Sequence, residues 1–175
     1  MSIKCLTVVL DDDGNDICVL ARSDNGDLNG HGEELKQFLR GFAIVRDLKV
    51  KDRRSVATNM GHLACVLVRF IRTNLGLVEL LASGTRGIGE EYVYTIYPRH
   101  AAELFPSLLN LRVEAAFPPY GTIDGLSSSK MTVIYDGLLD EFNAYQVQLT
   151  WEHASDTIHT QVEVQAMAAN GAMAG

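Results

Sequence analysis

Residues 59–76 read NMGHLACVLVRFIRTNLG and form the longest stretch of apolar residues at helical spacing in the chain. Thr58 or Asn59 can cap the start of this predicted helix, and Gly76 can end it. Its polar residues are His62, Arg69, Arg72 and Thr73, and offsets of seven and three residues put the first three on one stripe. Almost every other residue is apolar, so we expect burial on most of the circumference, against a sheet and against a second element or a neighbouring subunit.

Short runs rich in β-branched and aromatic residues predict strands on both sides of this helix. The runs are IKCLTVVL at 3–10, DICVLARS at 16–23, LVELLAS at 77–83, EEYVYTIYP at 90–98, LRVEAAF at 111–117, MTVIYD at 131–136, AYQVQLTWE at 144–152 and TIHTQVEVQA at 157–166. A brief strand is also expected at 42–45. The segment EELKQFLRG at 33–41 predicts a short helix, because Leu35, Phe38 and Leu39 share a face and Gly41 can end it.

The order of these elements favours an α+β fold, because strands and helices do not alternate as βαβ units. We expect antiparallel sheets packed on one long buried helix and one short helix, in a single domain over residues 1–166. The runs at 144–152 and 157–166 are expected to pair and to leave one face of the sheet wet. The final segment, MAANGAMAG at 167–175, predicts a flexible tail.

Composition narrows the class of protein. The chain has 175 residues, of which 47% are hydrophobic and 21% charged, as in a soluble globular domain. The net charge of −7 argues against binding to nucleic acid polymers. No apolar run is long enough to span a membrane, and the N-terminus does not resemble a signal peptide. Cys5, Cys18 and Cys65 lie far apart in apolar contexts, so we expect reduced core residues and a cytoplasmic location.

The loop ASGTRGIGE at 82–90 is the leading candidate site. It joins two predicted strands, yet it holds more glycine than a plain hairpin turn needs. Glycines let successive backbone N–H groups point into one concavity that binds anions. Thr85 adds a hydroxyl, Arg86 adds a forked cation suited to phosphate or carboxylate, and Gly87 adds a further amide. The pattern lacks the GK[ST] of a P-loop, and a flexible hairpin loop is the alternative.

Other donors for an anion lie at predicted helix starts and in a polar loop. Helix N-termini favour anions through unpaired N–H groups and the helix dipole. These candidates are His31, Arg54, Asn59 and, within GLSSSKM, Lys130. Tyr120 is a candidate for stacking on a base. Ordinary capping, a solvated charge run and a mobile loop are the competing interpretations.

Catalytic signatures are weak. No HExxH, GxSxG or Cys/His signature occurs, so no metal and no cofactor is expected. The segment YDGLLDEF holds Asp136, Asp140 and Glu141, which could act as an acid pair or bind a metal ion. Capping and turn roles are the alternative, because Gly137 after a strand favours a turn.

Four stretches taken together resemble a family of small, largely uncharacterised proteins encoded in phage genomes and prophages. They are GHGEELKQFL, NMGHLACVLVRFI, GTRGIGEEYVYTIYP and YDGLLDEF, and the resemblance spans roughly residues 25–143. It implies a phage accessory protein in the cytoplasm of a bacterial host and supplies no catalytic residues.

The leading hypothesis is a non-enzymatic homo-oligomer that binds and sequesters a nucleotide-derived immune signal, with Thr85 and Arg86 in the pocket. Small symmetric proteins of this kind need phosphate donors at subunit junctions and no catalytic group. Two alternatives remain open. One is a protein-interaction module that inhibits a host enzyme through its acidic surface. The other is a nucleotide hydrolase that uses Asp136, Asp140 or Glu141.

Overall fold

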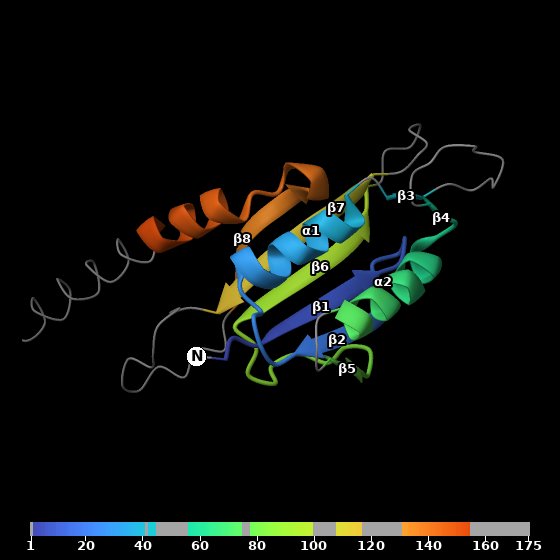
Figure 1. The fold of residues 1–175 in the computed structure, drawn as a ribbon, viewed down its shortest axis with the longest axis horizontal. Helices are drawn as coiled ribbons and strands as arrows, with labels where there is room; N and C mark the ends of the chain where they lie inside the picture. The colour runs from blue at the N-terminus through green and yellow to red at the C-terminus, as the bar shows by residue number, and fades with distance from the viewer. Residues whose placement is uncertain are drawn as a thin grey trace, which may run out of the picture.

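The computed structural model describes residues 2–40, 42–44, 56–74, 78–99, 108–116 and 131–154. These residues form the expected α+β fold, in which helices pack on a mixed sheet of six strands (Figure 1). The predicted strand at 157–166, the tail at 167–175 and three candidate site residues, Arg54, Tyr120 and Lys130, lie outside the described residues. Within the described ranges no helix has the length and apolar content that crossing a bilayer requires.

The six-stranded sheet has the order β5-β2-β1-β6-β7-β8. Its strands are β1 (Cys5–Leu10), β2 (Asp16–Arg22), β5 (Val78–Leu81), β6 (Tyr92–Pro98), β7 (Leu109–Ala116) and β8 (Met131–Leu138). A separate two-stranded parallel ribbon joins β3 (Ala43–Ile44) to β4 (Val56–Ala57). The expected antiparallel pairing holds for four of the five neighbouring pairs in the large sheet, and the exception is the parallel pair of β1 with β6.

This parallel pair changes the role of the glycine-rich loop. The strands on either side of the loop, β5 and β6, are not neighbours, because β2 and β1 lie between them. The loop is therefore a crossover that starts beside Asp16 and reaches β6 beside Lys4, at the other end of β1 and β2, and the alternative interpretation as a hairpin loop was wrong. A crossover must pass other strands, which accounts for a length that a hairpin turn does not need.

Both helices of the first half of the chain lie on one face of the sheet. Helix α2 (Met60–Asn74) packs on β1 and β2, and α1 (Glu33–Leu39) follows a single π-helical turn, η1 (Leu28–Gly32) (Figure 1). Leu63, Leu67 and Ile71 of α2 are buried, whereas the predicted polar stripe is exposed. Cys65 is exposed beside that stripe, so its assignment to the core was wrong.

The chain enters η1 through a close contact that only glycine permits. A Cβ on Gly26 would lie 2.7 Å from the carbonyl oxygen of Ile3, which is too near for any side chain. The Gly26 carbonyl accepts a hydrogen bond of 3.0 Å from the buried Tyr94 hydroxyl. Asp27 then caps η1 by accepting a bond of 2.7 Å from the Gly30 N–H. These contacts fix η1 and α1 above the centre of the sheet.

The predicted strand at 144–152 is a helix in the structure, and the described part of that helix covers residues 144–154. Ala144, Val147 and Trp151 are buried at helical spacing, whereas Tyr145 and Leu149 are exposed. Asn143 caps the start, since its side chain accepts a hydrogen bond of 3.1 Å from the Gln146 N–H. The alternation of apolar residues fitted a strand, and the capping residue before it was the signal that should have indicated a helix.

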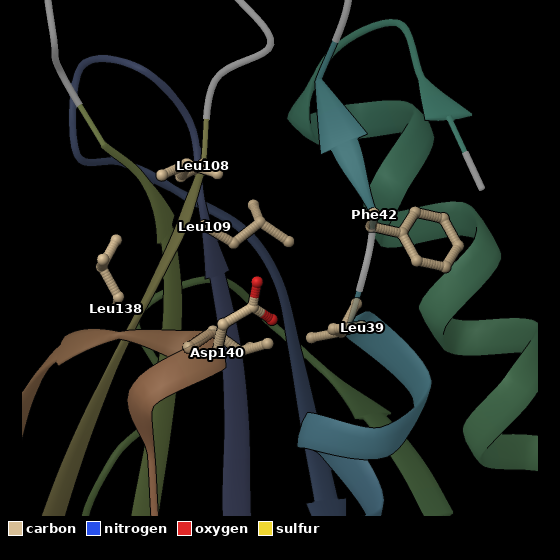
Figure 2. Close-up of a pocket in the computed structure, with 7 residues that line it drawn as sticks. Leu39, Phe42, Leu108, Leu109, Leu138 and Asp140 are labelled. Atoms are coloured by element: carbon tan, nitrogen blue, oxygen red, sulfur yellow. The ribbon is translucent and has the colours of Figure 1, made fainter. Parts of the chain in front are cut away.

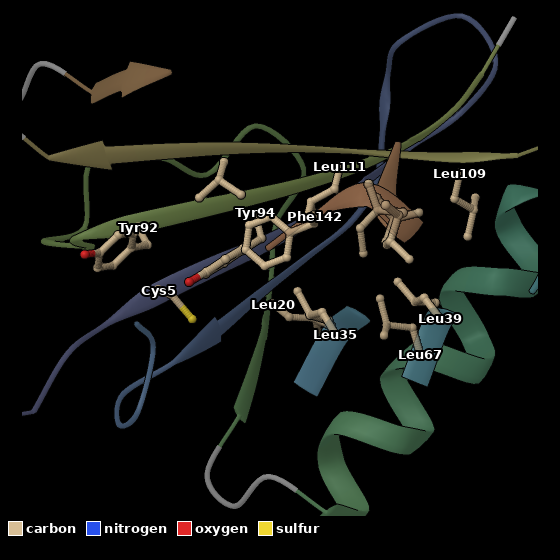
Figure 3. Packing of buried hydrophobic residues seen from close by; sticks show 14 of the residues in the cluster. Cys5, Leu20, Leu35, Leu39, Leu67, Tyr92, Tyr94, Leu109, Leu111 and Phe142 are labelled. Carbon is tan, nitrogen blue, oxygen red and sulfur yellow. The ribbon is translucent and has the colours of Figure 1, made fainter. Parts of the chain in front are cut away.

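The main core lies between the sheet and the helices (Figure 3). On β6 the inward residues are Tyr92, Tyr94 and Ile96, and on β7 they alternate from Leu109 to Ala115. A smaller buried cluster lies on the opposite face of the sheet and consists of Leu6, Val8, Val19 and Val93. Strand alternation therefore divides the apolar residues between two faces.

Candidate functional site

The crossover loop of residues 82–90 already holds a carboxylate. Arg86 donates from both terminal nitrogens to Asp16, with Nη1 to Oδ2 and Nη2 to Oδ1 each at 3.1 Å. The Gly84 N–H donates to the same carboxylate at 2.8 Å. Gly84 has a φ of 80°, a left-handed conformation that turns its amide toward Asp16 at little cost because glycine lacks a Cβ.

The other polar groups of the loop also have partners within the chain. The Thr85 hydroxyl donates to the Ala82 carbonyl at 2.7 Å. The N–H groups of Gly87 and Ile88 each donate to one oxygen of the buried Glu90 carboxylate, both at 2.7 Å. The loop is therefore a cradle for two anions that are side chains of the protein itself, and binding of an external anion here stays a prediction.

Arg86 and Gly84 together keep the Asp16 carboxyl ionised. Burial alone would raise the pKa of this carboxyl, but the hydrogen bonds from Arg86 and Gly84 and the positive charge of Arg86 lower it overall. Asp16 therefore stays ionised at neutral pH. The Arg86 side chain is 39% exposed and that of Asp16 12%, so solvent reaches the pair.

His31 lies in the core instead of at an accessible helix start. Its Nδ1 is 3.0 Å from Nη1 of Arg22 and its Nε2 is 2.6 Å from the Thr7 hydroxyl. Because arginine can only donate, Nδ1 accepts, and the neutral ring donates from Nε2 to Thr7. Burial, with a smaller contribution from Arg22, lowers the pKa of His31 to about 3.

Arg22 links this buried histidine to a partly exposed carboxylate. Its Nη1 also donates to Glu34, whose side chain is 32% exposed, while the Arg22 side chain is only 8% exposed. Arg22 Nε is buried, and it has no hydrogen-bond partner in the part of the chain that the structure describes. The sequence reasoning missed Arg22 and Glu34. The signal was present, because Arg22 has the same strand parity as the inward-facing Leu20, and an inward-facing cation requires a carboxylate.

The two arginine networks are separate. Asp16 begins β2 and Arg22 ends it, so their Cα atoms are about 20 Å apart at the usual rise of a strand. His31 therefore does not join Arg86 in one pocket. Asn59 caps α2 by accepting a hydrogen bond of 2.8 Å from the His62 N–H, which is the capping role that was the alternative to ligand binding.

The three acidic residues of the hydrolase hypothesis do not share an element. Asp136 lies on β8, where it accepts bonds from Arg112 at 2.9 and 3.0 Å and from the Tyr97 hydroxyl. Burial, followed by the bond to Asp136, raises the pKa of Tyr97 to about 12. Asp140 and Glu141 lie on the 3₁₀ turn η2 (Leu139–Glu141) and are exposed. The described residues contain no group of three or more His, Cys, Asp or Glu side chains placed to hold a metal ion.

Figure 2 shows a small apolar hollow at the end of the sheet near η2. It has a cavity volume of about 30 Å³ and is lined by leucines of α1, β8 and η2, by two leucines at the start of β7, by Phe42 and by Asp140. The Asp140 carboxylate is directed toward the space between Leu39 and Leu109. None of the predicted phosphate donors lines this hollow.

Comparisons with known proteins add no further assignment. No protein-family model, curated protein or solved structure matches the chain.

Proposed function

We propose that this protein is a non-enzymatic binding protein that captures a small anionic ligand at the loop of residues 82–90. One observation carries the proposal: the loop holds the Asp16 carboxylate with one glycine amide and both terminal nitrogens of Arg86. A phosphate presents similar oxygen geometry with more negative charge, so it competes for the same donors. Binding is then an exchange in which a phosphate takes the place of the Asp16 carboxylate.

The exposure of the pair supports such an exchange. Ion pairs that solvent reaches contribute only about 0–1 kcal/mol to stability. A phosphate meets the same three donors with more negative charge than the Asp16 carboxylate, so its attraction to Arg86 is stronger than the one it displaces.

Apolar side chains beside the loop support a second copy as the other wall of the pocket. Ile17 on β2, Leu80 on β5 and Ile88 in the loop belong to the segments that carry or adjoin the Arg86–Asp16 pair, and they are 37%, 66% and 50% exposed. A partner that covers them would exclude water from the cradle and strengthen each phosphate contact. The proposal therefore includes a homo-oligomer.

The resemblance to phage-encoded proteins leads us to propose a nucleotide-derived signal of bacterial immunity as the ligand. The compartment is then the cytoplasm of the infected host. Sequestration requires affinity without turnover, and the donors of this loop supply affinity only. None of them is a general base or a nucleophile activated by one.

Isothermal titration calorimetry with adenosine triphosphate and with a cyclic dinucleotide tests the proposal. Arg86→Ala is expected to weaken binding by about 1.5–3 kcal/mol, because it removes the forked cation. Asp16→Asn is expected to strengthen binding, because it removes the internal competitor. Arg112→Ala is the matched control, since Arg112 is another partly exposed arginine paired with an aspartate. Unchanged affinity in Arg86→Ala would refute the assignment.

Chromatography of the ligand after heat release tests the non-enzymatic part. Intact nucleotide is expected. An altered product would instead support a hydrolase, and Asp136→Asn would then be the first variant to examine.

A further inference from the structure

The outer border of the sheet offers a second surface, independent of the anion cradle. Strand β8 is the last strand of the described sheet and spans eight residues, none of which is buried. The opposite border, β5, is only four residues long. Short strands, lysine and proline are the usual protection of an open edge. The segment MTVIYDGL has no lysine or proline, and its one charge, Asp136, is paired with Arg112.

The helix over residues 144–154 follows β8 through η2 (Figure 1). Residues of β8, η2 and this helix line a groove with a volume of about 270 Å³ that is widely open to solvent. Ile134, Tyr135 and Val147 give it apolar walls. Gln146 and Thr150 add hydrogen-bonding side chains from the helix, and Glu141 adds a negative charge. The groove thus combines apolar contact, neutral polar groups and one acidic end.

We propose that this groove and the edge of β8 bind an extended, basic peptide segment of a partner protein, which adds to the sheet beside β8. Within the described ranges no strand pairs with the outer edge of β8, and the free backbone groups of such an edge supply the main-chain hydrogen bonds of an added strand. Alternate side chains of the added strand point to the same side, so apolar residues of the peptide can meet Ile134 and Val147.

Charge selects the partner. The residues that line the groove include Glu141 and no lysine or arginine, and Asp140 is exposed next to Glu141. The chain as a whole carries a net charge of −7. A segment with lysine or arginine gains favourable electrostatic contact here, whereas an acidic segment is repelled. A second copy of this chain carries the same excess of negative charge, so a basic partner fits better.

Fluorescence anisotropy of the full chain with synthetic peptides tests this proposal. The probe is a blocked peptide of alternating lysine and valine, as long as β8, and its acidic counterpart replaces lysine with glutamate. The basic peptide is expected to bind about tenfold more tightly or better, to weaken as salt rises, and to protect β8 amides from hydrogen exchange. No binding, or equal binding of the two peptides, would overturn the proposal.

A third peptide separates strand addition from nonspecific attraction. It has the lysine–valine sequence but carries N-methyl groups at alternate amides, on the edge that would pair with β8. This peptide keeps its charge and loses the hydrogen bonds, so its binding is expected to disappear. If it binds as tightly as its parent, the strand-addition model is wrong.

Two variants of the protein test whether the peptide binds at the groove. Gln146→Lys puts a positive charge at the groove and is expected to weaken binding of the lysine–valine peptide about tenfold. Tyr145→Lys adds the same charge at a neighbouring residue that is 66% exposed and does not line the groove. Its affinity is expected to stay within about twofold of the parent protein. Equal losses in both variants would show that net charge alone governs binding.

Discussion

The two ends of β2 carry arginine–carboxylate pairs in different surroundings. At the start of the strand, Asp16 meets Arg86 from the crossover loop, and their side chains are 12% and 39% exposed. At the end of the strand, Arg22 meets Glu34, with side chains that are 8% and 32% exposed, and Arg22 also bonds the buried His31. The network at the end of β2 holds η1 and α1 on the sheet. The pair at the start of β2 is the one that we propose a ligand displaces.

This difference follows from solvation. Water compensates the loss of an exposed ion pair, so such pairs contribute about 0–1 kcal/mol. Removing one partner of a buried pair leaves polar groups without compensation and costs about 3–5 kcal/mol. An arginine predicts a functional site only after its burial and its partners are known. The sequence shows neither directly.

The largest effect should come from Arg22→Ala. The substitution leaves Nδ1 of His31 buried without its donor and releases Glu34. We expect the free energy of unfolding to fall by about 3 kcal/mol, near the lower end for buried pairs because Glu34 is 32% exposed. Urea unfolding measures this. Arg112→Ala breaks an exposed pair and should cost less than about 1 kcal/mol. Equal losses in the two variants would contradict the contrast between buried and exposed pairs.

The next effect is the response of the buried network to acid. The folded pKa of His31 is about 3, below the 6.5 of a free histidine. The unfolded chain therefore binds a proton at this residue between these pH values, while the folded chain does not. Stability is lost as pH falls below about 6.5, by at most about 1.4 kcal/mol per pH unit, or about 2 kcal/mol by pH 5.

Urea unfolding at pH 7, 6 and 5 checks this prediction. His31→Gln removes the titration and should flatten the dependence of unfolding free energy on pH over this range. His62→Gln is the matched control, because His62 is exposed on α2. If His31→Gln keeps the slope of the parent protein, the titration of His31 is not its source.

Much of the fold was predictable because burial leaves a periodic record in the sequence. The spacing of apolar residues located α2 and its exposed stripe, and strict alternation located the inward face of β7. The helix over residues 144–154 was missed because Val147, Leu149 and Trp151 also alternate as in a strand. The parallel pairing of β1 with β6 was missed because periodicity does not record which strands are neighbours.

The candidate site was predictable in kind but not in detail. The glycines and Arg86 indicated an anion cradle, and the loop does hold carboxylates. Nothing local in the sequence identifies Asp16 as the group held, because it lies 70 residues from Arg86. His31 was expected at an accessible helix start, and its burial depends on the inward-facing Arg22 and Thr7 from the sheet.

The smallest change in the free energy of unfolding should come from substitutions at the Asp16–Arg86 pair. This measurement tests the difference between the two ends of β2 most directly. Asp16→Asn and Arg86→Ala should each change the free energy of unfolding by less than about 1 kcal/mol, and a double-mutant cycle between them should give a coupling in the same range. The folded pKa of Asp16 is lowered, so the stabilisation from the pair is present above the usual aspartate pKa and disappears as pH falls below it. Urea unfolding at pH 7 and pH 3 measures both quantities.

A coupling of about 3 kcal/mol would mean that Asp16 and Arg86 are a structural clamp, and a clamp of that strength would leave no donors for a ligand. A small coupling is what an exchangeable cradle requires, because the free energy that holds Asp16 in place must be recovered before any phosphate can bind there.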